Sequence, residues 1–161
     1  MENITVGIAE FNVVKAPDKI TTIGLGSCCG IVLYDESKKI AGLVHVLLAD
    51  SKCEKNVLNK AKYADTGITL LYEEMKKAGA NPMRIKAKLA GGAHMFSFQN
   101  SDNSIFTIGQ KNVKVCKETL AKLRVPIISE DVLGTCGRTI TFDTLTNKLR
   151  IKSVGKGEKL I

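Results

Sequence analysis

Apolar and polar positions alternate along most of the chain with the two-residue period of β-strands, and two stretches show the spacing of helices. Strands are predicted at 3–14, 28–34, 39–45, 83–90, 126–132, 138–143 and 149–154. Helices are predicted at 63–78 and, after a short strand from residue 105 and a junction at 109–112, up to residue 124. We expect a polar loop at 50–60 and a loose tail at 155–161.

The stretch from Thr21 to His45 has the pattern of a β-hairpin with two apolar arms. Both arms are apolar at successive positions, so this part of the sheet must be covered on both faces. The pattern therefore predicts a layered α/β fold. If the arms close symmetrically over residues 35–38, Cys28 lies directly opposite His45, with their Cβ atoms ~5 Å apart. A slip of one residue would send one of the two side chains to the other face.

A thiol and an imidazole at that separation form the minimum apparatus for nucleophilic catalysis. The alternative is structural: buried cysteines are common as small core residues, and a histidine among valines and leucines is commonly a satisfied core residue. Gly24 and Gly26 lie just before Ser27 and Cys28, where a tight turn would aim backbone N–H groups at one point and form an oxyanion hole. These glycines favour the catalytic interpretation.

A second histidine follows a pair of glycines. Gly91 and Gly92 indicate a close approach of two backbone segments, and His94 is the alternative to His45 as a base. Because a polar loop follows His94, we expect it to be a solvated turn histidine.

Composition restricts the class of protein. The 161 residues, 44% of them hydrophobic and 25% charged, suit one soluble domain covering 1–161. The chain has no run of ~18 apolar residues and no evident signal peptide, so a cytoplasmic location without membrane insertion is expected. Its five cysteines include no CxxC spacing, so we expect reduced thiols and neither a disulfide framework nor a zinc site.

The net charge of +8 favours an acidic partner. Nucleic acid is a poor candidate, because aromatic residues make up only 5% of the chain, tryptophan is absent, and the lysines are scattered. In the predicted strand 83–90, Arg84, Lys86 and Lys88 alternate with apolar residues. This alternation predicts one buried face and one basic face that could meet acidic helices of a protein partner.

Six segments together resemble the CheD family of chemoreceptor glutamine deamidases. They are GLGSC at 24–28 preceded by Thr22, VHVLLAD at 44–50, YADTGITLLYEEM at 63–75, GGAHMF at 91–96, IGQKN at 108–112 and DVLGTCGR at 131–138. The resemblance covers nearly the whole chain in the right order. It implies a three-layer sandwich of β-sheets and helices, similar to the catalytic domain of the cytotoxic necrotising factor toxins.

The resemblance also implies a reaction and its residues. Cys28 would be the nucleophile, His45 the base and Thr22 the residue that orients His45. The implied activity is hydrolysis of glutamine side-chain amides on methyl-accepting chemotaxis receptors through a thioester, with release of ammonia and no cofactor. A methylesterase activity, reported in some members, would use the same route. A CheC-type phosphatase that competes with the receptor is the implied regulator.

Three positions depart from the family pattern or add to it. Family members usually carry proline at Ala49 and glycine at Leu133, and Cys29 adds a second thiol, which we expect on the opposite face of the strand from Cys28. Two other functions remain open on the residues alone. One is a cysteine protease or general thiol amidase, and the other is a non-enzymatic adaptor that binds receptor and phosphatase.

Overall fold

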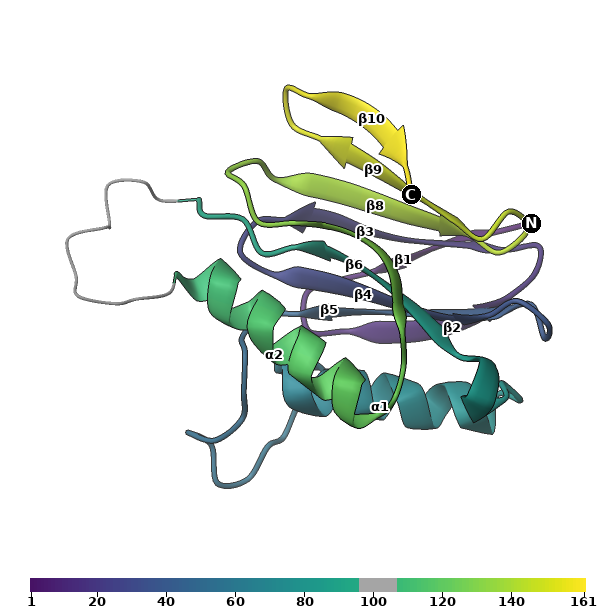
Figure 1. Ribbon diagram of the computed structural model, residues 1–161, viewed down its shortest axis with the longest axis horizontal. Coiled ribbons are helices and arrows are strands. Elements are labelled where there is room, and N and C mark those ends of the chain that lie inside the picture. The colour runs from purple at the N-terminus through teal and green to yellow at the C-terminus, as the bar shows by residue number, and fades with distance from the viewer. Residues whose placement is uncertain (96–106) are drawn as a thin grey trace.

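Two five-stranded sheets and a pair of helices form three layers (Figure 1). The computed structural model describes residues 1–95 and 107–161. The first sheet has the strand order β1 (Asn3–Val6), β3 (Lys19–Leu25), β8 (Arg138–Asp143), β9 (Lys148–Ser153), β10 (Gly157–Leu160). The second has the order β2 (Phe11–Lys15), β5 (Ile40–Val46), β4 (Cys29–Asp35), β6 (Lys86–Gly91), β7 (Ile127–Val132). The helices are α1 (Ala64–Lys77) and α2 (Ile108–Lys122), with short 3-10 helices η1 (Lys60–Lys62) and η2 (Pro82–Arg84). The predicted layered α/β fold is confirmed.

The second sheet is the middle layer, so its two central strands are covered on both sides (Figure 1). Every residue of β4 and β5 is buried, as their uninterrupted apolar pattern predicts. One core lies between this sheet and the helices, where Ile68, Leu71 and Met75 of α1 pack. The other lies between the two sheets and is built around Phe142 and Tyr34. The candidate site therefore lies inside a layered structure.

The hairpin of β4 and β5 forms as predicted, but its register differs by two residues. His45 lies opposite Gly30, whereas the symmetric closure predicts Cys28 at that place. The loop spans 36–39 instead of 35–38, because Asp35 pairs with Ile40. An even shift leaves every side chain on its predicted face. Cys28 and His45 therefore still share the face of the second sheet that meets the first, although they are not directly opposed.

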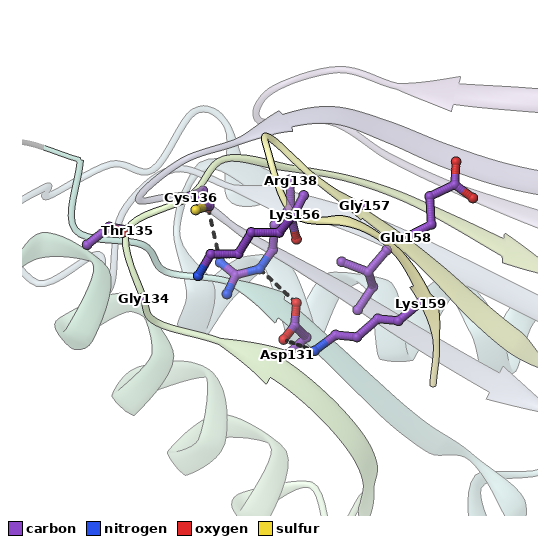
Figure 2. Close-up of a pocket in the computed structure, with 11 residues that line it drawn as sticks. Asp131, Gly134, Thr135, Cys136, Arg138, Lys156, Gly157, Glu158 and Lys159 are labelled. Atoms are coloured by element: carbon purple, nitrogen blue, oxygen red, sulfur yellow. Dashed lines mark hydrogen bonds and ion pairs between the residues drawn. The ribbon is translucent and has the colours of Figure 1, made fainter.

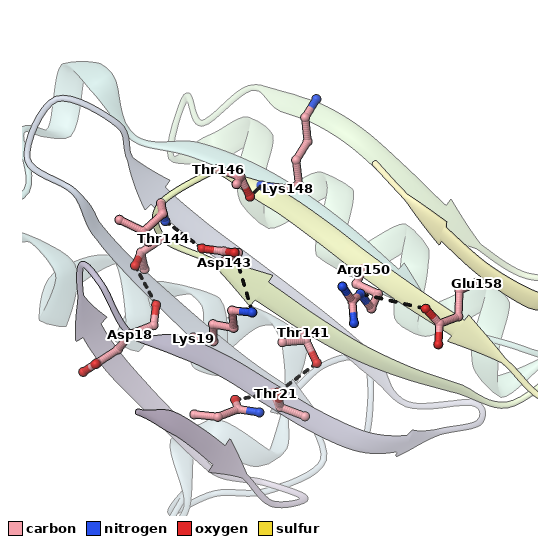
Figure 3. Close-up of polar contacts among 12 residues, drawn as sticks. Asp18, Lys19, Thr21, Thr141, Asp143, Thr144, Thr146, Lys148, Arg150 and Glu158 are labelled. Carbon is pink, nitrogen blue, oxygen red and sulfur yellow. Dashed lines mark hydrogen bonds and ion pairs between the residues drawn. The ribbon is translucent and has the colours of Figure 1, made fainter. Parts of the chain in front are cut away.

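The outer face of the first sheet is polar (Figure 3). Thr21 donates a hydrogen bond to the side chain of Asn3 and lies 2.9 Å from the hydroxyl of Thr141 on the neighbouring strand. The next residue, Thr22, is fully buried on the inner face. Successive residues of a strand point to opposite faces, so the two threonines serve different surroundings.

Three other boundaries differ from the sequence prediction. The single strand predicted at 3–14 is two strands, β1 and β2, which join different sheets after a turn in which Ala9 has φ 59°. The segment 109–112 lies inside α2, because Thr107 and Gln110 form a capping box that starts the helix earlier. The tail predicted to be loose forms β10 on β9. The short strand predicted from residue 105 begins outside the described residues.

The predicted basic face at 83–90 is also wrong. Lys88 is only 4% exposed; its Nζ donates to the backbone oxygens of Asn147 and Ile161, at 2.6 and 2.9 Å. Arg84 belongs to η2 rather than to the strand, and Lys86 pairs with Glu36. The strand β6 therefore presents no row of free positive charges.

Candidate functional site

A hydrogen-bonded chain joins the two sheets through Thr22 and His45, both fully buried. The Thr22 hydroxyl donates to the backbone oxygen of Val6 at 2.7 Å, and the hydroxyl oxygen of Thr22 lies 2.7 Å from Nδ1 of His45. Thr22 comes from β3, next to an irregularity in the pairing with β8, and His45 comes from β5. The first sheet thus holds the imidazole of the second.

The direction of these hydrogen bonds fixes the tautomer of His45. A carbonyl oxygen only accepts, so the Thr22 proton points to Val6 and the Thr22 oxygen must accept from Nδ1–H of His45. A neutral imidazole protonated at Nδ1 has its lone pair on Nε2. This Nε2 is buried and has no hydrogen-bond partner among the described residues. It is available to take a proton.

Cys28 lies directly before β4, is 8% exposed and belongs to the core between the sheets. Burial raises the pKa of its thiol and the neighbouring Cys29 adds to the rise, while its own backbone N–H acts in the opposite direction. Burial lowers the pKa of His45 from 6.5 to about 4. Both shifts favour the uncharged forms, so the resting pair is a thiol and a neutral imidazole.

The segment before Cys28 is held by two other parts of the chain. Gly24 lies in the irregular part of β3 with φ 78°, in the left-handed region that favours glycine. The backbone oxygen of Gly26 accepts from Ala93 N–H, and that of Ser27 accepts from the side chain of Asn112, both at 2.9 Å. The glycines at 91 and 92 make this contact possible, because a side-chain carbon at Gly91 would collide with the Cys28 carbonyl. The predicted close backbone approach is confirmed.

Sequence reasoning did not select Asn112, a fully buried side chain on α2. A signal was present: Asn112, Cys116 and Leu120 recur at four-residue spacing, so a polar residue occupies the apolar stripe of the helix.

Two other residues considered at the sequence level lie near the same segment. Cys29 faces the helices, where it lies in the same core cluster as Cys116 of α2, so its predicted orientation is confirmed. His94 is half-buried, and its backbone N–H donates to Gly134. Thr22 is hydrogen-bonded to His45, and among the described residues no hydrogen bond connects His94 to Thr22 or to His45.

A pocket lies beside the loop that carries the DVLGTCGR motif (Figure 2). Asp131 accepts from Arg138 Nε at 2.9 Å and pairs with Lys159 Nζ at 2.8 Å. Arg138 also donates to the backbone oxygen of Leu133 at 2.8 Å. The arginine of the motif therefore fixes the loop. Thr22, Cys28 and His45 do not line this pocket.

Leu133, where the family pattern has glycine, adopts φ 69°. Its backbone N–H donates to Gly91, so this loop also rests on the double-glycine segment.

Two possible features are not seen in the described part of the chain. Within 1–95 and 107–161, no helix is long and apolar enough to span a membrane. In the same ranges, no three histidine, cysteine or acidic side chains gather in a way that could hold a metal ion.

The fold and the site define a class: a layered α/β protein in which a buried histidine, oriented by a threonine, lies at the strand ends that carry a cysteine. The family model described as CheD chemotactic sensory transduction matches residues 47–153. The chain belongs to the CheD family.

Relatives match over almost the full length of the chain. It is 53% identical, over 98% of its length and 97% of the relative's, to a probable chemoreceptor glutamine deamidase CheD of Caldanaerobacter subterraneus subsp. tengcongensis. It is 50% identical, over 98% of each chain, to the chemoreceptor glutamine deamidase CheD of Halalkalibacterium halodurans. Among solved structures, the hypothetical protein YfiH of Bacillus licheniformis shares the fold, with a TM-score of 0.50 and 14% identity over 77% of this chain and 51% of that one.

Proposed function

We propose that the protein is a hydrolase that deamidates glutamine side chains of methyl-accepting chemotaxis receptors, with Cys28 as nucleophile, His45 as base and Thr22 as the residue that orients His45. The names of the relatives support the activity and the substrate class. The observation that carries the residue assignment is the hydrogen-bonded chain from Val6 through Thr22 to His45, which leaves Nε2 of the buried imidazole without a hydrogen-bond partner among the residues that the structure describes. If His45 were only a structural core residue, we would expect both of its ring nitrogens to be hydrogen-bonded.

The reaction begins from an uncharged pair. As the Cys28 sulfur attacks the carboxamide carbon of glutamine, His45 Nε2 takes the thiol proton, and the carbonyl oxygen becomes an oxyanion. Backbone N–H groups of Ser27 and Cys28 stabilise that oxygen. His45 then gives its proton to the leaving nitrogen, the C–N bond breaks, and ammonia departs from a thioester.

Water completes the cycle. His45 removes a proton from a water molecule, which adds to the thioester carbon, and collapse of the intermediate breaks the C–S bond. The proton held by His45 returns to the sulfur, and the product is glutamate. A glutamate methyl ester could enter the same route, with methanol replacing ammonia as the leaving group. The chemistry draws on the side chains of Cys28 and His45, on backbone N–H groups and on water.

Regulation by a CheC-type phosphatase that competes with the receptor is part of the proposal. Exposed apolar side chains flank the strand ends that carry the site, namely Ile23 in β3, Leu48 just after β5, and Met95. Such residues are typical of surfaces that bind another protein. We also infer that residues 1–161 act as one domain in the cytoplasm, where the signalling parts of receptors lie. A competition assay of receptor fragment against phosphatase tests the shared surface.

The main experiment incubates the purified protein with a receptor cytoplasmic fragment and maps mass changes by peptide. Conversion of an amide to an acid adds ~1 Da without chain cleavage, as the thioester route requires. Cys28→Ala should abolish the change, and Cys116→Ala, which removes a buried thiol on α2, should retain it. Chain cleavage would indicate a protease. Undiminished deamidation by Cys28→Ala would overturn the assignment of the nucleophile.

A further inference from the structure

The carbonyl groups before and at Cys28 all have fixed partners. Gly26 accepts from Ala93 N–H, Ser27 from Asn112 Nδ2 and Cys28 from Gly92 N–H, each at 2.9 Å. The C=O and N–H of a trans peptide point in opposite directions. The N–H groups of Ser27 and Cys28 therefore point away from the Gly92–Ala93 segment and away from Asn112.

Those two N–H groups have no other hydrogen-bond acceptor in the described part of the chain. The Cys28 N–H belongs to the same residue as the proposed nucleophilic sulfur, so it lies next to the reacting thiol. Two unpaired backbone donors beside a nucleophilic sulfur have the arrangement that stabilises an oxyanion. Of the three donors that hold the segment, only Asn112 is a side chain, so only its bond can be removed by substitution alone.

Asn112 makes a second contact that ties together the two strand ends of the site. The same Nδ2 that donates to Ser27 also donates to the backbone oxygen of Leu47, two residues after His45, at 3.1 Å. The first turn of α2 approaches closely enough for this, because Gly109 lies directly against the backbone of Gly92. A side chain on a helix thus fixes the loop before β4 and the end of β5 together.

The buried position of the Asn112 side chain destabilises the fold. Asn112 is fully buried, and its Oδ1 has no partner among the described residues. An unsatisfied buried oxygen destabilises a fold, and an apolar residue of similar size would avoid that cost. Packing alone therefore does not account for an asparagine at this place, whereas its two N–H donors do.

We propose that Asn112 is a positioning residue, which holds the Ser27–Cys28 peptide so that the Cys28 N–H is directed at the oxyanion of the reaction. The inference rests on the proposed function in assigning Cys28 as the nucleophile. Asn112 touches neither the sulfur nor the imidazole in this role. It acts through the peptide plane, so its loss should affect steps that form an oxyanion and spare steps that do not.

Two reagents separate these steps without a receptor. Acylation of Cys28 by p-nitrophenyl acetate passes through an oxyanion, and the p-nitrophenolate released in the first turnover measures its rate. Alkylation of Cys28 by iodoacetamide displaces iodide at a saturated carbon, so it needs the thiolate but no oxyanion donor. Peptide mass mapping assigns both products to Cys28. The ratio of the two rates reports the oxyanion donors alone.

The variants are Asn112→Leu, similar in size without a donor, and Asn112→Ser, which is smaller and remains polar in case the leucine variant does not fold. Thr119→Val is the matched control, because Thr119 is a buried polar residue farther along α2. We expect acylation to slow by ~100-fold in Asn112→Leu, as for loss of an oxyanion-hole donor, and alkylation and its pH profile to stay within ~3-fold. Thr119→Val should change neither rate.

Deamidation of a receptor fragment gives the parallel result. In Asn112→Leu, kcat should fall by a factor similar to that for acylation while KM changes little, because the oxyanion exists only after binding. Equal slowing of acylation and alkylation, or no slowing of acylation, would overturn the role of Asn112. If acylation depends on Asn112 but the wild type leaves receptor glutamines unchanged, the proposed substrate fails and the positioning role stands.

Discussion

Replacing Thr22 by valine tests the hydrogen-bonded chain that orients His45. Valine has the shape of threonine without the hydroxyl, so Val6 O and His45 Nδ1 each lose their 2.7 Å partner. Both atoms are enclosed between the sheets. A buried polar group left without a partner costs ~1–3 kcal/mol, so the loss of both partners should lower the free energy of unfolding by about 2–6 kcal/mol in total. Urea denaturation measures this change.

The effect on catalysis follows from the tautomer. Without Thr22, nothing fixes the proton on Nδ1, and a proton on Nε2 prevents that atom from accepting the thiol proton. General-base catalysis contributes ~10²–10⁴-fold, so we expect kcat for deamidation to fall by at least ~100-fold. His45 and His94 are the only histidines in the sequence, so the nitrogen spectrum of labelled protein reports the His45 tautomer directly. It should show Nδ1–H in the wild type and a mixture in the variant.

Thr21→Val is the matched control. Thr21 is the adjacent residue of β3 and is also buried, but its hydroxyl bonds Asn3 and Thr141 on the outer face (Figure 3). This control should lose less stability, because Asn3 is exposed and Thr141 is half-buried, and it should keep both its kcat and the wild-type tautomer. The reasoning would be refuted if Thr22→Val retained the kcat of Thr21→Val, because the hydroxyl at 22 would then have no part in orienting the base.

Three further outcomes are expected. Because burial lowers the pKa of His45 from 6.5 to about 4, the stability contributed by its neutral form is complete above pH 6.5 and is lost as the pH falls toward 4. In urea melts over that range, the free energy of unfolding should fall by ~2 kcal/mol more in the wild type than in His45→Gln. Equal losses in the two proteins would contradict this. Cys29→Ala should lower the free energy of unfolding by ~1 kcal/mol but keep deamidation, since its thiol faces the helices; an inactive, folded variant would contradict this. Leu133→Gly should raise the free energy of unfolding by ~0.5–1 kcal/mol, because Leu133 has φ 69°; a lower urea midpoint would contradict this.

The hairpin shows what an apolar pattern can and cannot determine. Alternation settles which residues of one strand share a face, but it does not settle whether Cys28 and His45 lie on the same side, because a slip of one residue would separate them. The register could not be deduced, because both strands are buried at every position and their largely apolar pattern allows more than one pairing. The side chain of Asp35 settles it by accepting from the backbone of Ser37 and Lys38, which moves the loop by one residue.

The remaining errors and omissions concern Lys88, the tail and Thr22. Lys88 alternates with apolar neighbours as a surface lysine would, yet its Nζ reaches the backbone oxygens of Asn147 and Ile161. The tail forms a strand because β9 offers it a free edge. The role of Thr22 was inferred from the family resemblance and not from spacing, because nothing local distinguishes it from Thr21. For Lys88 and Thr22 the deciding contact lies in a segment that is distant in sequence, whereas the tail pairs with the strand directly before it.

The burial of the site also bears on the kind of substrate it suits. The thiol and imidazole are both held in uncharged forms by the apolar surroundings between the sheets. A neutral carboxamide enters such surroundings at a lower desolvation cost than a carboxylate does. Deamidation converts the former into the latter, so the product is less compatible with the site than the substrate. The same burial that keeps His45, the proposed base, unprotonated therefore also favours release of glutamate, and a site built around a thiolate and imidazolium pair would lack this property.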